Sequence, residues 1–318
     1  MMNRREFARS VAGAAAETAA AGLGPTATLA ASDEPGAGAA PFKLTVMLWT
    51  VFRGQPFAQR LEKVAEAGYR AVELVDEFKG WSKEDFAAAR KKKNELGMEI
   101  DATAGVWHTL ADAEDREKFL ASLHDFLGVM KELECTRLVM QTGNTVPGLA
   151  REAMHTNCVE TLKRAGEIAA QNNIELLVEN IDPEENPKYF LTSSAEGFEI
   201  VRAVGNPHVK FLYDLFHEQI AEGNLIAKLD KNIGLIGLVH VADVPGRHEP
   251  GSGEIYYPNI YRKLAELNYN RYIAMEFLPV GEPVAALRQA REMAMKFGAV
   301  HGKQSLNASP TGRSHATA

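Results

Sequence analysis

The chain has 318 residues, of which 46% are hydrophobic and 24% are charged, a composition typical of globular proteins. Its formal net charge of −7 argues against a nucleic-acid partner, because phosphate binding requires a basic surface. No run of 18 or more apolar residues follows residue 40, so no membrane span is predicted. Two cysteines are too few for a disulfide framework, and we interpret both Cys135 and Cys158 as packing residues.

The first 40 residues differ in composition from the rest of the chain. Arg4 and Arg5 stand together before an Ala-rich, weakly apolar run that ends in the small residues TLAAS. This order resembles a twin-arginine export signal and predicts a periplasmic protein whose fold excludes residues 1–40. The alternative is a disordered tail on a cytoplasmic protein, which Glu17 inside the apolar run favours.

From Lys43 onward, short apolar runs rich in β-branched residues alternate with longer amphipathic stretches. In the stretch at residues 57–68, apolar side chains recur at helical spacing, and a glycine follows where a C-cap would lie. We predict strands at residues 43–48, 71–75, 99–104, 137–142, 174–179, 209–214, 236–241 and 272–277.

Eight strands that alternate with helices over about 250 residues predict an α/β fold, a single-domain (β/α)₈ TIM barrel. An open, doubly wound sheet is the competing architecture, but a Gly-rich phosphate turn usually follows its first strand. Here the first strand is followed by VFRGQPFAQR, which has no G-x-G-x-x-G pattern. We therefore predict a barrel over residues 41–301 and a flexible, low-complexity tail over residues 302–318.

Four consecutive predicted strands end in a lone side chain that can bind a metal ion. Strands five to eight end with Glu179, Asp214, His240 and Glu276, in the runs ELLVE, KFLYD, IGLVH and YIAME. The C-terminal ends of the strands of a TIM barrel meet at one mouth, where the active sites of such barrels lie. We therefore expect three carboxylates and one imidazole to converge above the barrel.

The ligand types at these strand ends indicate which ion they would bind. Burying three carboxylates without partners would strongly destabilise the fold, and a divalent cation removes that cost. Hard oxygen ligands with one nitrogen suit Mn²⁺ or Mg²⁺, and Co²⁺ is a further candidate. A cysteine-rich zinc site is excluded, because no cysteine is among the four residues.

Four segments of the second half of the chain carry a family resemblance. They are LVENIDP, YDLFH, HVADVPGRHEPGSGEI and AMEF, at residues 177–183, 213–217, 240–255 and 274–277. Together they resemble the xylose-isomerase-like superfamily of sugar isomerases and epimerases. Within that superfamily, the segment ADVPGRHEPGSGEI is most similar to the hydroxypyruvate isomerases.

The resemblance implies that the four strand-end residues bind the metal and that Glu179 and Glu276 are also the acid/base pair. It implies that His217 and Arg247 hold the polar end of a small-molecule substrate, a ketose or a hydroxy-keto acid. Such a site removes a proton next to a carbonyl group, while the metal stabilises the resulting enediolate. The implied activity is that of a metal-dependent isomerase similar to the hydroxypyruvate isomerases.

The same motifs admit three alternative functions. His240 occupies a position where hydroxypyruvate isomerases carry Gln and ketose 3-epimerases carry His, so a 3-epimerase is the first alternative. A non-catalytic carbohydrate-binding barrel would have lost one of the two glutamates, and both are present. An endonuclease of the same superfamily would bind three metals with more histidines, which 9 His and a net charge of −7 disfavour. Whether the protein forms a homo-oligomer stays open.

Two tryptophans close the first and third predicted strands. Because strand ends face the barrel mouth, we expect Trp49 and Trp107 to form apolar walls against the carbon atoms of the substrate. Ordinary packing in the core is the alternative for both side chains.

The loop after the seventh predicted strand is rich in Gly and Pro, which would shape it to fold over the barrel mouth. The alternative for Arg247 in this loop is a surface side chain paired with Glu249. We expect Asp243 to orient His217 or Arg247. We expect Glu254 to anchor the loop by accepting hydrogen bonds from backbone N–H groups.

The export signal can be tested directly. Cleavage near TLAAS would leave a mature chain that begins between residues 31 and 40, which N-terminal sequencing of periplasmic protein would detect. Replacing both Arg4 and Arg5 with lysine should then retain the precursor in the cytoplasm. Full-length protein found in the cytoplasm alone, with and without these substitutions, would contradict the prediction.

Overall fold

The computed structural model describes residues 39–299. The strands are β1 (Lys43–Met47), β2 (Ala71–Leu74), β3 (Glu99–Thr103), β4 (Arg137–Gln141), β5 (Glu175–Glu179), β6 (Val209–Asp214), β7 (Ile236–Val241) and β8 (Tyr272–Met275). Each strand pairs in parallel with the next, and β8 pairs with β1, so the sheet closes into a barrel. The predicted TIM barrel is confirmed. The proposed export segment, except residues 39 and 40, and the tail from residue 302 lie outside the described residues.

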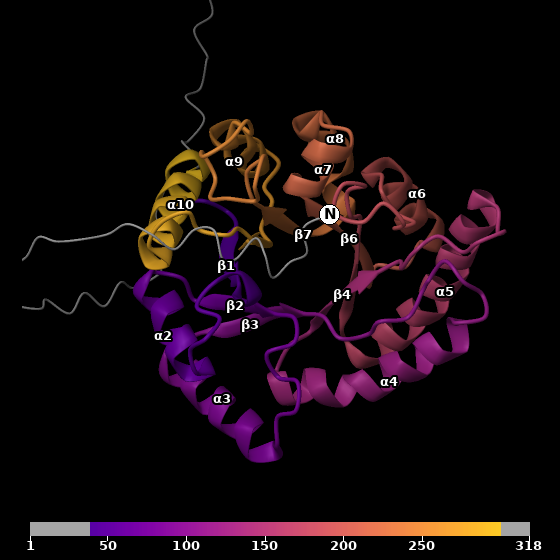
Figure 1. Cartoon of the computed structure of the whole chain (residues 1–318), viewed down its shortest axis with the longest axis horizontal. Helices are drawn as coiled ribbons and strands as arrows, with labels where there is room; N and C mark the ends of the chain where they lie inside the picture. The colour runs from indigo at the N-terminus through magenta and orange to yellow at the C-terminus, as the bar shows by residue number, and fades with distance from the viewer. Residues whose placement is uncertain (1–38, 300–318) are drawn as a thin grey trace, which may run out of the picture. The chain divides into compact units, whose positions relative to one another are not determined.

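Helices connect the strands and surround the barrel, from indigo α2 to yellow α10 in Figure 1. They are α2 (Phe57–Glu66), α3 (Lys83–Glu95), α4 (Arg116–Leu133), α5 (Arg151–Asn172), α6 (Ser194–Val204), α7 (Leu215–Ala221), α8 (Leu225–Asn232), α9 (Tyr257–Glu266) and α10 (Pro283–Gly298). The predicted apolar face of α2 buries Leu61 and Val64. Between residues 39 and 299, no helix has the length and apolar character needed to cross a membrane.

Two apolar layers stabilise the barrel. The inner layer consists mainly of small and aliphatic side chains, namely Ala71, Ala102, Ala104, Val139, Leu177, Leu212, Leu238, Tyr272 and Ala274. The larger layer lies between strands and helices, where Phe198 from α6 packs on Phe211 from β6 with ring centroids 4.6 Å apart. Cys135 and Cys158 are free thiols in this second layer, and burial raises the pKa of both. Such thiols stay protonated at neutral pH, consistent with packing residues.

The register of the parallel strands carries the strand ends to the same mouth. Asp214 pairs with His240, and His240 pairs with Ala274, which lies two residues before Glu276. β5 and β6 end at Glu179 and Asp214, as predicted. β7 has its predicted bounds and continues one residue past His240, whereas β8 is shorter than predicted and ends one residue before Glu276. Side chains on neighbouring strands therefore reach the mouth from four consecutive positions around the barrel.

Candidate active site

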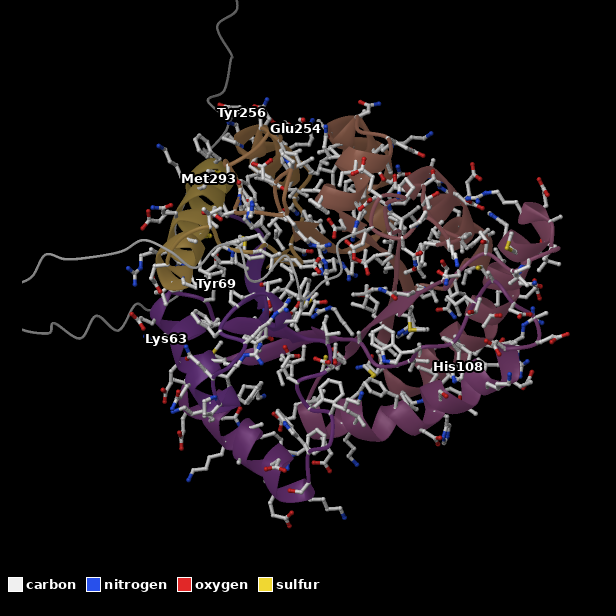
Figure 2. All side chains as sticks on the ribbon, in the orientation of Figure 1. Lys63, Tyr69, His108, Glu254, Tyr256 and Met293 are labelled. Carbon is white, nitrogen blue, oxygen red and sulfur yellow. The ribbon has the colours of Figure 1, made fainter. Side chains whose placement is uncertain are left out.

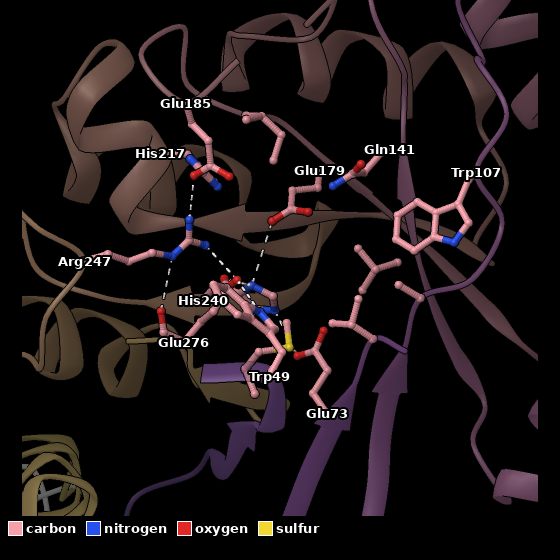
Figure 3. A pocket seen from close by; sticks show the side chains of 15 residues that line it. Trp49, Glu73, Trp107, Gln141, Glu179, Glu185, His217, His240, Arg247 and Glu276 are labelled. Atoms are coloured by element: carbon pink, nitrogen blue, oxygen red, sulfur yellow. Dashed lines mark hydrogen bonds and ion pairs between the residues drawn. The ribbon is translucent and has the colours of Figure 1, made fainter. Parts of the chain in front are cut away.

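The four strand-end residues converge at the mouth of the barrel. Glu179, Asp214, His240 and Glu276 each offer one ligand atom, and these atoms all lie within 4.8 Å of one another. All four side chains are buried. Figure 3 shows Glu179, His240 and Glu276 around the same cavity. Three carboxylate oxygens and one imidazole nitrogen form a donor set that fits a divalent cation.

Asp214 ends β6 and is the N-cap residue of α7, so its two carboxylate oxygens have different partners. Its Oδ1 caps the helix by accepting hydrogen bonds from the backbone N–H groups of Phe216 at 2.7 Å and His217 at 3.3 Å. Its Oδ2 lies 3.5 Å from Nε2 of His217 and 3.5 Å from a guanidinium nitrogen of Arg247. Capping fixes the carboxylate orientation, so one oxygen remains directed at the site.

Glu276 is the carboxylate with the most partners in the cluster. Its Oε1 lies 2.7 Å from a guanidinium nitrogen of Arg247 and accepts a hydrogen bond from Nε1 of Trp49 at 3.1 Å. Its Oε2 lies 2.8 Å from Nδ1 of His240. Burial alone would raise the pKa of Glu276, but Arg247 and His240 outweigh it and hold the pKa well below its usual range. Glu276 is therefore ionised at neutral pH.

Glu179 lies in a different environment from Glu276. Its Oε1 is 3.9 Å from Nδ1 of His240, and this is the one ion pair of its carboxylate among residues 39–299. Burial raises the pKa of Glu179 to about 8, an effect that the charge of His240 only partly offsets. Two glutamates whose pKa values are pushed in opposite directions are typical of sites that move protons.

Arg247 is buried at the mouth and does not pair with Glu249, so the expected alternative of a surface arginine is wrong. Its other terminal nitrogen, Nη1, lies 2.8 Å from Glu185 Oε2, and Figure 3 shows the guanidinium between Glu185 and Glu276. Arg247 has a φ of 58° and follows Gly246 with a φ of 92°. A non-glycine residue in this left-handed region is strained, and such strain is most often found at functional sites.

The loop that carries Arg247 is anchored by Asp243, and not by Glu254 as the sequence suggested. Asp243 accepts hydrogen bonds from three backbone N–H groups, those of Val244, Gly251 and Ile255. Glu254 accepts from the side chain of Gln219 instead, and Figure 2 shows it beside Tyr256 at the edge of the barrel. The prediction that Asp243 orients a side chain directly is also wrong, because its oxygens bind the loop backbone. Asp243 thus holds the loop in shape.

His217 is oriented by Asp182, which follows β5. Nδ1 of His217 lies 2.7 Å from Asp182 Oδ2, while Asp182 Oδ1 accepts from the backbone N–H groups of Glu184 and Glu185. Burial lowers the pKa of His217, but Asp214 and Asp182 outweigh it and raise the pKa to about 9. His217 therefore carries a positive charge at neutral pH, and both His217 and Arg247 line the cavity of the cluster.

The two tryptophans differ in their placement. Trp49 lies in the short 3-10 helix after β1 and donates a hydrogen bond to Glu276, so it forms a wall of the site. Trp107 lies four residues after β3 and not at its end, and it is 59% exposed. It lines the cavity on the side opposite Arg247 (Figure 3). The alternative of ordinary core packing is therefore wrong for Trp107.

Three polar side chains that the sequence analysis did not predict also line the cavity: Glu73, Gln141 and Glu185. Glu73 on β2 is 1% exposed, and its Oε2 lies 3.0 Å from Nε2 of His240. A charged residue inside the apolar run AVELV was the signal that could have identified it. Gln141 could have been identified because it ends β4, next to the strand that Glu179 ends.

Comparison with known proteins agrees with this geometry. Residues 61–297 match the model of the xylose isomerase-like TIM barrel family. The hydroxypyruvate isomerase of Escherichia coli (strain K12) is 28% identical over 256 residues, which cover 77% of this chain and 97% of that protein. The 2-oxo-tetronate isomerase of Pectobacterium atrosepticum is 28% identical over 246 residues, which cover 76% of this chain and 93% of that protein.

Solved structures show the same similarity. The crystal structure titled AP endonuclease, family 2, from Brucella melitensis has a TM-score of 0.71 and 26% sequence identity, with 80% of this chain and 98% of that chain covered. The family match extends over most of the barrel, including all four residues of the strand-end cluster. The resemblance seen in the sequence is thereby confirmed: the chain belongs to the xylose isomerase-like TIM barrel family.

Proposed function

We propose that this protein is a metal-dependent isomerase of small hydroxy-2-oxo acids, similar in activity to hydroxypyruvate isomerase. The observation that supports this most strongly is the convergence of Glu179, Asp214, His240 and Glu276 within 4.8 Å, beside the buried cation of Arg247. A cluster of acids serves to bind an ion, and a neighbouring guanidinium serves to bind an anionic substrate.

The metal would be held by the four residues of this cluster. Oxygen ligands with one nitrogen suit Mn²⁺ or Mg²⁺, and Co²⁺ also fits the donor set. When bound, such an ion polarises a carbonyl oxygen and stabilises the negative charge that develops on it. The residues of the chain then have to bind the substrate, orient it and move its proton.

The two glutamates flank the position where that proton would be transferred. One carboxylate removes the proton from the carbon that bears the hydroxyl group, next to the carbonyl, and an enediolate results. Return of a proton to the former carbonyl carbon, together with a shift of the hydroxyl proton to the former carbonyl oxygen, converts a 3-hydroxy-2-oxo acid into a 2-hydroxy-3-oxo acid. Glu276 is held in place by Arg247, His240 and Trp49, whereas Glu179 has one distant partner and more freedom to shift.

The substrate class follows from Arg247 and from the relatives. Both relatives are named as isomerases of 2-oxo acids, and such substrates carry a carboxylate. The guanidinium of Arg247 offers a planar fork that matches a carboxylate in two parallel hydrogen bonds. His217, held by Asp182, would donate from Nε2 to a further substrate oxygen. Trp49 would cover the carbon atoms of the substrate.

A ketose 3-epimerase is the second candidate, and His240 is the residue that favours it. The same proton removal gives epimerisation when the proton returns to the same carbon from the other side, so the cluster supports both reactions. A non-catalytic barrel is disfavoured because both glutamates face the cavity. An endonuclease is disfavoured because the strand-end cluster contains one histidine, and the net charge of −7 opposes DNA binding.

The metal site can be tested by a substitution that preserves the helix cap. In Asp214→Asn, the amide oxygen still accepts hydrogen bonds from α7, but one negative charge of the cluster is lost. We expect Mn²⁺ affinity to fall at least about 10-fold, measured by competition with a fluorescent chelator. Glu254→Gln, at the edge of the barrel, serves as the control and should bind Mn²⁺ normally. Equal affinities in both variants would contradict the assignment.

The acid/base pair can be tested by measuring the turnover of hydroxypyruvate. Glu179→Gln and Glu276→Gln each keep a carbonyl oxygen for the ion but lose a basic carboxylate. Each change should lower kcat for hydroxypyruvate by at least about 10²-fold, because proton transfer occurs in the transition state. The double variant should be little worse than either single one, since both residues serve one sequence of steps. Near wild-type turnover by Glu179→Gln would refute the assignment of Glu179 and Glu276 as the acid/base pair.

The role of Arg247 can be tested with two molecules that differ in one group. Dihydroxyacetone carries a hydroxymethyl group where hydroxypyruvate carries its carboxylate. Arg247→Lys keeps the charge but loses the fork, so KM for hydroxypyruvate should rise about 10-fold or more. Inhibition of the reaction by dihydroxyacetone should change much less in the same variant. If the variant binds hydroxypyruvate and dihydroxyacetone more weakly by the same factor, Arg247 does not recognise the carboxylate.

A further inference from the structure

Glu73 is a buried acid whose side chain has a single hydrogen-bond partner among residues 39–299. It lies on β2, on the far side of the cavity from Arg247, as Figure 3 shows. Its carboxylate oxygen Oε2 is 3.0 Å from Nε2 of His240, and both side chains are 1% exposed. A buried carboxylate is costly unless it is paired and hydrogen-bonded, and for Glu73 this partner is His240.

The imidazole of His240 is held from both sides, and its two nitrogens face different groups. Nδ1 faces the ligand set, 2.8 Å from Glu276 Oε2 and 3.9 Å from Glu179 Oε1. Nε2 faces Glu73. A carboxylate accepts but does not donate, so an ionised Glu73 pairs with an Nε2 that carries a hydrogen, and an ionised Glu276 likewise pairs with an Nδ1 that carries one. An ion bound in the cluster would displace the hydrogen on Nδ1, because this nitrogen faces the ligand set, whereas Nε2 would keep its hydrogen toward Glu73.

Resting on the proposed metal site, we propose that Glu73 is a positioning residue for His240. It accepts the Nε2–H of His240, fixes the plane of the ring and leaves Nδ1 as the metal-binding atom. A ligating histidine commonly donates its second N–H to a carboxylate in this way, and the bond increases the basicity of the ligand. Glu73 also limits which side chains can replace His240, because a replacement needs both a ligand atom and an N–H.

The proposal can be tested through metal affinity, without reference to turnover. In Glu73→Met, which preserves the volume, the acceptor is lost, and Mn²⁺ affinity should fall about 10- to 100-fold. In Glu73→Gln, the amide oxygen can still accept the Nε2–H, so affinity should lie between that of Glu73→Met and wild type. This second variant differs little in shape from wild type, so its Mn²⁺ affinity tests the proposal even if Glu73→Met does not fold.

Asp101→Asn is a matched control for the loss of a buried acid. Asp101 lies on the neighbouring strand β3, is equally buried, and accepts a hydrogen bond from Thr45 at 2.6 Å, with no bond to His240. Its substitution should leave Mn²⁺ affinity within about 2-fold of wild type. An effect as large as that of Glu73→Met would overturn the proposal, because any buried charge near the barrel mouth would then suffice.

The hydrogen on Nε2 can be observed by NMR of the Co²⁺-loaded protein. A histidine bound to Co²⁺ through Nδ1 gives a strongly shifted Nε2–H signal in H₂O that is absent in D₂O. We expect one such signal in wild type, its loss in His240→Gln, and broadening by faster exchange in Glu73→Met. A sharp, unchanged signal in Glu73→Met together with unchanged affinity would overturn the role of Glu73 alone. Wild-type protein that binds no divalent ion would overturn the metal site and this proposal with it.

Discussion

The structure of the barrel mouth depends on the balance of buried charges. Several acidic side chains are buried there, among them Glu73, Glu179, Asp214 and Glu276. Buried carboxylates are tolerated when opposite charges lie within hydrogen-bond distance. Arg247 and His240 meet this condition for Glu276, whereas Glu179 has its partner at 3.9 Å and a pKa raised to about 8. A divalent ion among these groups would supply the positive charge that Glu179 lacks.

The barrel itself explains why these charges are neighbours. Parallel strands around a closed sheet end at one mouth, so side chains from residues 179 to 276 meet without any local sequence contact. Residues at or near the strand ends also hold the following segments in place. Asp214 caps α7, and Asp243, three residues after His240, anchors the loop of Arg247. The geometry of the cluster and that of the loop of Arg247 are therefore both fixed by residues at or just after the strand ends.

The sequence was sufficient to predict the barrel and the convergence of its strand ends, because periodicity and strand order determine both. It was not sufficient for contacts that depend on loop conformation. Asp243 and Glu254 are both acids in one Gly-rich loop, and only the folded backbone decides which of them receives its N–H groups. Glu73 was not predicted as a site residue, because it lies within an apolar run and its partner His240 is 167 residues away in the chain. Trp107 was placed at the end of the third strand, but it lies four residues beyond the end of β3.

Solvent deuterium uptake tests the central claim, metal-dependent proton transfer at this cluster, most directly. Purified protein is incubated with hydroxypyruvate in D₂O, with Mg²⁺ or with a chelator, and the products are followed by NMR. We expect deuterium at C3 of recovered hydroxypyruvate and at C2 of the aldehyde product, with Mg²⁺ present and not with the chelator. Absence of deuterium from both carbons, or uptake that is unchanged by the chelator, would contradict this claim.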